Sequence, residues 1–153
     1  MRQATPRAKF SFLIHDVSRM RRTFFDQALK PLGISAAGAK ASMHFSVADQ
    51  RKVQDVLAQH AVKMPFVVVQ PTSRWLFKCW EDEKVAQLID ALVAEGRTVV
   101  LTAAPDQKEM AMIANIQSLC HSHNVVSLAG ELSLPQLAAL IDAAQLFIGV
   151  DSA

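Results

Sequence analysis

The chain has 153 residues, enough for one ordinary domain, and 51% of them are apolar against 20% charged, which excludes a disordered tail. The net charge of +2 is too small to indicate binding to nucleic acid. Two distant cysteines do not form a disulfide framework, and no uninterrupted apolar stretch reaches the roughly 18 residues of a membrane span. We therefore expect a cytoplasmic protein, with contact to the periphery of the inner membrane left open.

The first 34 residues predict an arm followed by one long amphipathic helix. Residues 1–9 are polar and basic, and over residues 10–32 the apolar side chains recur every three or four positions. Pro31 and Gly33 mark the end of this helix. Its apolar stripe offers a surface through which two copies can form a homodimer. Residues 35–46 are small and polar, and we interpret them as a linker.

Residues 47–153 have the pattern of an α/β domain. After a helix at 47–61, short β-branched runs alternate with amphipathic segments. We predict strands at 66–69, 98–102, 125–128 and 146–150, with helices at about 82–95, 107–120 and 134–144. Such alternation predicts a Rossmann-like parallel sheet with right-handed crossovers. Ligands of these sheets bind at the carboxyl ends of the strands, so the loops there are the first candidates for a site.

The loop after the first strand, residues 70–80, holds two hydroxyls and two cations, Thr72, Ser73, Arg74 and Lys78. Hydroxyls donate hydrogen bonds and a lysine supplies a point charge, so this set suits a diphosphate. A solvated loop whose tryptophans pack on the sheet is an equally good interpretation.

Acidic residues follow two further strands. Asp106 is positioned to cap the next helix, and either Asp106 or Glu109 can reach a ribose or sugar hydroxyl. Asp151 and Ser152 follow the fourth strand, where a carboxylate can accept sugar hydroxyls or cap a helix.

Other chemistries find little support. Residues 120–123, Cys-His-Ser-His, resemble half of a metal site, but no second pair follows at zinc-site spacing, so we expect a helix terminus and no metal. No dinucleotide fingerprint, phosphate-binding P-loop or nucleophile elbow is present. We expect no cofactor.

The strings FVVVQPTSRW and FKCW at 66–80, SLAGELSLPQLAALID at 127–142 and LFIGVDS at 146–152 agree in order and spacing with a known family. Over roughly residues 43–153 the chain resembles the C-terminal domain of lipopolysaccharide core heptosyltransferases, in particular the heptosyltransferase III type. The resemblance implies a GT-B glycosyltransferase. In such enzymes the C-terminal domain binds an ADP-heptose donor, the N-terminal domain binds the lipopolysaccharide inner core, and transfer is metal-independent and inverting.

Carried over by motif, the resemblance implies that Thr72 and Ser73 contact the donor phosphates and that Lys78 neutralises them. Asp151, with Ser152, would hold the sugar or phosphate region, and the family's acidic residue after the second strand falls between Asp106 and Glu109. The first 45 residues do not resemble the family's N-terminal domain, which carries the catalytic base. We therefore assign no catalytic residue and expect this chain alone to be inactive or weakly active.

Residues 10–34 have a second resemblance, to the first helix of MarR-type transcriptional regulators, where that helix builds a dimer interface. The alternatives to a transferase are therefore a non-catalytic dimerising module and a MarR-like regulator. The regulator is disfavoured because no recognition helix and wing follow.

Overall fold

The computed structural model describes residues 30–33 and 43–150. The chain divides into two units, residues 1–43 and residues 44–153. Most of the predicted N-terminal helix and its dimerising stripe lies outside the described residues, as do Asp151 and Ser152. Where that helix was predicted to end, Lys30–Leu32 form a 3-10 turn, η1, and Gly33 follows with a left-handed φ of 69°. Such a residue is a common stop for a helix.

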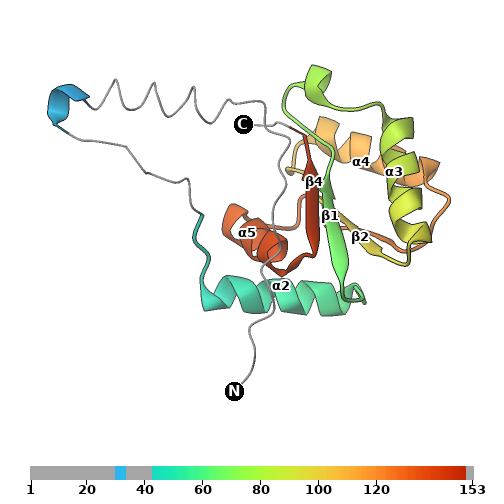
Figure 1. Ribbon diagram of the computed structural model, residues 1–153, viewed down its shortest axis with the longest axis horizontal. Coiled ribbons are helices and arrows are strands. Elements are labelled where there is room, and N and C mark those ends of the chain that lie inside the picture. The colour runs from blue at the N-terminus through green and yellow to red at the C-terminus, as the bar shows by residue number, and fades with distance from the viewer. Residues whose placement is uncertain (1–29, 34–42, 151–153) are drawn as a thin grey trace. The chain divides into compact units, whose positions relative to one another are not determined.

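The second unit is built on one four-stranded parallel sheet, as predicted (Figure 1). Its strands are β1 (Phe66–Gln70), β2 (Thr98–Leu101), β3 (Val125–Ser127) and β4 (Leu146–Gly149), in the order β3-β2-β1-β4. All three pairings are parallel. The two central strands, β1 and β2, are buried along almost their whole length, which explains their continuous runs of valine.

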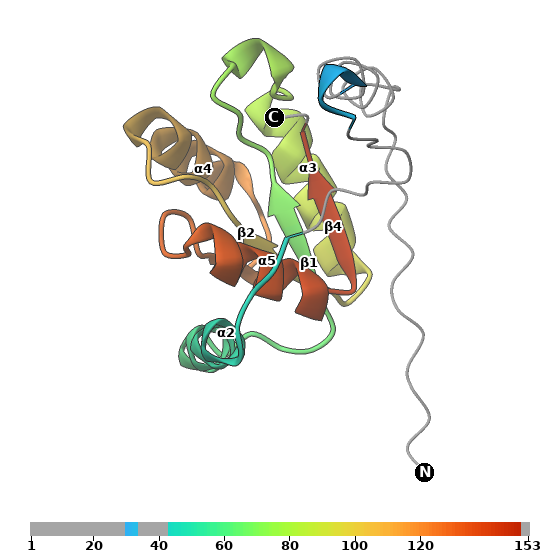
Figure 2. The ribbon, with the colours of Figure 1, turned by 90° about the vertical axis from the view of Figure 1, so that its left-hand side faces the viewer.

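Four α-helices cover the two faces of the sheet. They are α2 (Val47–Gln59), α3 (Asp82–Ala94), α4 (Gln107–Leu119) and α5 (Leu134–Ala143). Figures 1 and 2 show α2 and α5 on one face and α3 and α4 on the other. Alternate residues of β1 serve the two layers: Phe66 and Val68 pack toward α2 and α5, whereas Val67 and Val69 pack toward α3 and α4.

Side-chain caps explain where three of these helices begin. Ser46 accepts a hydrogen bond from the backbone N–H of Asp49 and Ser133 accepts one from that of Gln136, each as half of a capping box. Asp106 accepts from the backbone N–H groups of Lys108 and Glu109. The predicted capping role of Asp106 is therefore confirmed.

The loop between β1 and α3 is more ordered than predicted, because Leu76–Lys78 form a 3-10 turn, η2. It is the short green turn at the top of Figure 1, beyond the carboxyl end of β1. Among the described helices, none is both long and apolar enough to cross a membrane. Cys79 and Cys120 are not joined in a disulfide.

Candidate functional site

The chain leaves β1 through a buried polar turn. Thr72 and Ser73 are only 1% and 3% exposed, so their hydroxyls need partners within the protein or in a ligand. The Oγ of Ser73 accepts a hydrogen bond from the backbone N–H of Trp75 at 3.3 Å, which closes a short turn. This contact uses a lone pair of the Ser73 oxygen and leaves its O–H hydrogen available for donation.

Thr72 contacts a residue 37 positions away, on α4. Its Oγ1 donates a hydrogen bond of 2.6 Å to Oε2 of Glu109. The same carboxylate oxygen accepts from the backbone N–H of Ala104 at 3.2 Å. Glu109 is only 9% exposed and shares the buried side of α4 with Ile113 and Ile116. The structure thus brings together the turns that follow β1 and β2.

Only one of the two oxygens of the Glu109 carboxylate is used in these contacts, since both hydrogen bonds reach Oε2. Across the described part of the chain, every buried side-chain nitrogen or oxygen has a hydrogen-bond partner. Oε1 has no hydrogen-bond partner among the described residues, so it is not fully buried and reaches solvent. Glu109 is therefore a buried carboxylate that presents one acceptor oxygen outward from the first turn of a helix, where negative charge is favoured.

Asp106 plays a different part. Its Oδ1 accepts from the backbone N–H of Lys108 at 2.9 Å and from that of Glu109 at 3.3 Å. Oδ1 of Asp106 is therefore the cap of α4. Of the two acidic candidates after β2, Asp106 starts the helix and Glu109 faces the turn after β1.

An exposed aromatic group lies on the other side of the same loop. The rings of Trp75 and Phe77 stack with centroids 5.9 Å apart and planes inclined by 17°. The Nζ of Lys78 lies 4.8 Å from the centre of the Trp75 ring, within the range of a cation–π interaction. Trp75 and Phe77 are 55% and 83% exposed, so the predicted alternative of tryptophans packed on the sheet does not describe Trp75.

The ends of β1 and β4 lie beside each other. Gln70 pairs with Gly149, and the backbone N–H of Val150 donates to the carbonyl of Gln70 at 3.3 Å. The predicted arrangement, in which the loops after these strands share one edge of the sheet, therefore holds as far as Val150. On the other side of β1, the backbone N–H of Thr102 donates to the carbonyl of Val69 at 3.0 Å.

The loop after β3 closes the same edge. Gly130 has a left-handed φ of 75°, and its N–H donates to the carbonyl of Ala103 at 3.0 Å. A Cβ at this position would lie 3.2 Å from Sδ of Met110 and 3.5 Å from Cα of Pro105. Glycine is therefore needed both for the backbone conformation and for the close approach to the turn before α4.

A small apolar hollow also lies near the ends of β1 and β4, between Gln70, Pro71, Trp80, Leu88 and Ile148. Its volume is about 30 Å³. Its lining is almost entirely apolar, so it offers a diphosphate few hydrogen-bond donors. The polar turn at Thr72, Ser73 and Glu109, and not this hollow, is the candidate site.

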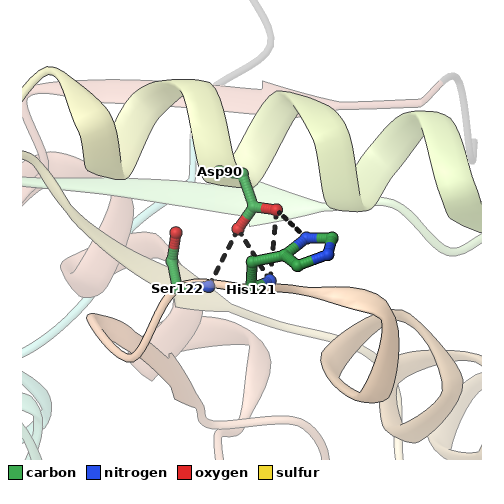
Figure 3. A network of polar contacts seen from close by, with 3 residues as sticks. All are labelled: Asp90, His121 and Ser122. Carbon is green, nitrogen blue, oxygen red and sulfur yellow. Dashed lines mark hydrogen bonds and ion pairs between the residues drawn. The ribbon is translucent and has the colours of Figure 1, made fainter.

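A second carboxylate cluster lies at the opposite edge of the sheet, where α3 nears its end and α4 gives way to β3 (Figure 3). Asp90 accepts from the backbone N–H groups of His121 and Ser122 at 3.0–3.1 Å, and its Oδ2 lies 3.0 Å from Nδ1 of His121. Hydrogen bonds from Ser122 and from the backbone of His121 lower the pKa of Asp90 to about 2. The residues that resembled half of a metal site thus join two helices.

The neighbouring Cys120 has no features of a reactive thiol. Burial, and then the negative charge of Asp90, raise the pKa of the Cys120 thiol. The thiolate is the nucleophilic form, so this environment suppresses reactivity.

The sequence did not predict a role for Ala104, whose N–H donates to Glu109, or for Asp90. It also did not predict the contact between Thr72 and Glu109. One signal was available for Glu109. Glu109, Ile113 and Ile116 are spaced by four and three, which places a charged residue on the apolar side of a helix. A carboxylate at such a position needs buried donors, and this need points to the preceding strand ends.

Known proteins of one family resemble this chain in sequence and in fold. The sequence model of the family described as glycosyltransferase family 9 (heptosyltransferase) matches residues 6–153, which takes in the segment that resembles MarR-type regulators. The chain is 43% identical over 125 residues to lipopolysaccharide heptosyltransferase 3 of Escherichia coli. That alignment covers 82% of this chain and 37% of the relative, so the chain spans little more than a third of the relative's length.

Solved structures share the fold. A glycosyltransferase of family 9 from Veillonella parvula DSM 2008 superposes with a TM-score of 0.68 at 18% identity, over 80% of this chain and 35% of the other. The E. coli heptosyltransferase WaaC with ADP-2-deoxy-2-fluoro heptose gives a TM-score of 0.53 at 19% identity, over 94% of this chain and 41% of the other. At these identities the likeness shows the fold alone.

Proposed function

The chain belongs to glycosyltransferase family 9, the heptosyltransferase family, and we propose that it forms the donor-binding part of such an enzyme. The reaction is transfer of heptose from ADP-heptose to the lipopolysaccharide inner core. The relative at 43% identity bears the name of a lipopolysaccharide heptosyltransferase, and one solved structure of the same fold contains an ADP-linked fluoroheptose. The carboxyl edge of the sheet is the place where a parallel α/β domain binds such a ligand.

One observation supports this proposal most strongly. The carboxylate of Glu109 is nine-tenths buried, yet one oxygen has no partner among the described residues and reaches solvent beside the turn after β1. Burying a charge costs free energy unless it is hydrogen-bonded, so an incompletely bonded buried carboxylate suits a ligand that supplies the missing donor. Sugar hydroxyls are such donors.

The remaining roles follow from chemistry and position. Ser73, whose hydrogen is available, donates to the diphosphate, and Lys78 supplies positive charge to it. Asp151 and Ser152 follow the end of β4, next to β1, and contact the sugar or phosphate region. Asp106 supports the site by capping α4, while Glu109 accepts the sugar hydroxyl. In the transfer itself, the charge that develops on the leaving diphosphate is stabilised by these donors and by Lys78.

The acceptor in this proposal is the lipopolysaccharide inner core at the membrane surface. The chain would work in the cytoplasm, peripheral to the inner membrane. No residue of this chain is proposed as the catalytic base, and no metal takes part.

Donor binding is tested by calorimetric titration of the full chain with ADP. We expect saturable binding with a dissociation constant of about 1 mM or below. Lys78→Met and Ser73→Ala should each weaken it about three- to tenfold through loss of a charge-assisted contact. Lys63→Met, which removes an exposed lysine before β1, is the matched control and should leave the affinity unchanged. Absence of saturable binding, or an equal loss in the control, would contradict a donor site at this edge.

A further inference from the structure

We propose that Thr72 is a positioning residue of the donor site: it holds the Glu109 carboxylate for a sugar hydroxyl of the donor and does not itself contact the diphosphate. This inference rests on the proposed function. It departs from the role that motif resemblance implies for Thr72, and it separates two adjacent hydroxyls that the sequence cannot tell apart.

The first step is the direction of the hydrogen bond between Thr72 and Glu109. A carboxylate only accepts hydrogen bonds, so at 2.6 Å the hydroxyl of Thr72 must be the donor. A hydroxyl has one hydrogen, and here it is directed to Oε2 of Glu109. A diphosphate oxygen is also an acceptor, so Thr72 cannot donate to it while this bond exists.

The second step is charge. Were the diphosphate to bind at the Thr72 hydroxyl, its oxygens would approach a carboxylate that lies 2.6 Å from the same atom. Two anions sharing one buried hydroxyl repel each other strongly, because a partly buried site screens charge poorly. The diphosphate is therefore better placed away from Thr72, on the side of Ser73.

Ser73 provides the contrast within the same turn. Its Oγ accepts from the backbone N–H of Trp75, and its hydrogen has no acceptor among the described contacts. Both hydroxyls are almost completely buried, so the difference between them does not come from exposure. It comes from what each oxygen contacts: Thr72 donates to a carboxylate, whereas Ser73 accepts from an amide.

The third step is the rigidity of Glu109. Oε2 is held by Thr72 and by the N–H of Ala104, from the turns after β1 and β2 respectively. With one oxygen fixed at two points, the direction of Oε1 is fixed as well. Without the Thr72 hydroxyl, the carboxylate would retain a single contact of 3.2 Å and could rotate. Fixing an acceptor before the ligand arrives lowers the entropy lost on binding.

The test uses the full chain with three probes: inorganic pyrophosphate, ADP and ADP-heptose. The variants are Thr72→Val, which keeps the shape and removes the hydroxyl, Thr72→Ser, which keeps the hydroxyl, and Glu109→Gln. We expect Thr72→Val to leave the pyrophosphate affinity within twofold of wild type. It should weaken a probe that carries the recognised hydroxyl by about tenfold, the loss of one well-placed hydrogen bond to a charged group.

The pattern across probes identifies the hydroxyl. A loss that already appears with ADP assigns Glu109 to the ribose, and one confined to ADP-heptose assigns it to the heptose. Glu109→Gln should follow Thr72→Val from probe to probe, and Thr72→Ser should restore wild-type affinity. An equal loss of pyrophosphate affinity in Thr72→Val would overturn the proposal, because it would mean that Thr72 contacts phosphate.

Failure of the proposed function is a separate outcome, in which wild type binds none of the three probes. The contact itself is then measured without ligand, by a double-variant cycle of Thr72→Val and Glu109→Ala in the unfolding equilibrium. We expect the two changes to be coupled by about tenfold in the equilibrium constant, as for groups in direct contact. A coupling below twofold in the unfolding equilibrium constant would contradict the positioning role of Thr72, whether or not ADP binds.

Discussion

Two carboxylates join distant segments at opposite edges of the sheet, and they differ in how completely they are used. Asp90, at the amino edge, is contacted through both oxygens by the backbone of His121 and Ser122 and by the His121 ring. Glu109, at the carboxyl edge, uses only Oε2 for Thr72 and Ala104. Each carboxylate lies on a helix and accepts hydrogen bonds from loop residues, so their structural tasks are similar.

The difference indicates which edge is built for a ligand. A carboxylate whose oxygens are both satisfied by its own chain gains nothing from an added donor. One with an oxygen left over, directed outward from a buried position, can bind a donor without breaking a bond inside the protein. Saturation thus separates a structural carboxylate from a binding one more clearly than burial does.

The largest expected effect belongs to the saturated carboxylate. Asp90→Ala should lower the free energy of unfolding by about 2–3 kcal/mol, because it removes the acceptor of several hydrogen bonds to a charged group. Chemical denaturation measures the change. Asp55→Ala, at an exposed position of α2, is the control and should stay within about 0.5 kcal/mol of wild type. Asp90→Ala should leave the ADP affinity unchanged. A loss of affinity would contradict the assignment of ligand binding to the carboxyl edge alone.

Next in size is the glycine that closes the carboxyl edge. Gly130→Ala should cost about 1–2 kcal/mol in the free energy of unfolding for the left-handed backbone alone. The close contact with Met110 adds to this cost. Gly96→Ala is the matched control, since Gly96 has a φ of 81° but no atom within 4 Å of the added Cβ. Thermal unfolding of the two variants isolates the contact, and equal losses would show that the loop moves aside.

A single chemical change, carboxylate to amide, compares the two edges directly. Asp90→Asn should lower the free energy of unfolding by about 1 kcal/mol, because the amide lacks the negative charge that strengthens the hydrogen bonds from His121 and Ser122. Glu109→Gln should cost less than about 0.5 kcal/mol, because its oxygen can keep Thr72 and Ala104 while its nitrogen faces solvent. A larger loss in Glu109→Gln than in Asp90→Asn would reverse our interpretation of saturation.

The last expected effect is a pH dependence confined to the amino edge. The pKa of Asp90 is lowered from 3.8 to about 2, so its contribution to stability is present above about pH 4 and is lost as the pH falls through about 2. Between these values the wild-type stability should fall more steeply than that of Asp90→Asn. Denaturation curves at several pH values give the two slopes, and parallel slopes would contradict a lowered pKa.

Most of the fold could be predicted from sequence because its signals are local. Continuous valine runs marked β1 and β2, the spacing of apolar residues marked the helices, and Asp106 marked the start of α4. Parallel pairing followed from the alternation of the two patterns. The turn η2 was not predicted because Leu76–Lys78, none of which is buried, carry no periodic signal.

The residues of the site could be predicted from the sequence, but the hydrogen bonds between them could not. Loop position and residue type were enough to select Thr72, Ser73, Lys78, Asp106 and Glu109. They could not show that Thr72 meets Glu109 across 37 residues, because that contact depends on how far α4 tilts its first turn toward β1. The division of labour between Asp106 and Glu109, left open by the sequence, depends on the same geometry.

The stacked rings at η2 have a practical consequence for spectroscopy. The chain contains two tryptophans and no tyrosine, and both tryptophans, Trp75 and Trp80, lie in the segment from β1 to α3. Each is about half exposed, and the Trp75 ring carries the Lys78 ammonium on its face. Tryptophan fluorescence from this protein therefore originates at the carboxyl edge of the sheet. A ligand that draws Lys78 away from the indole should change the fluorescence intensity, whereas changes around Asp90 should leave it unaltered.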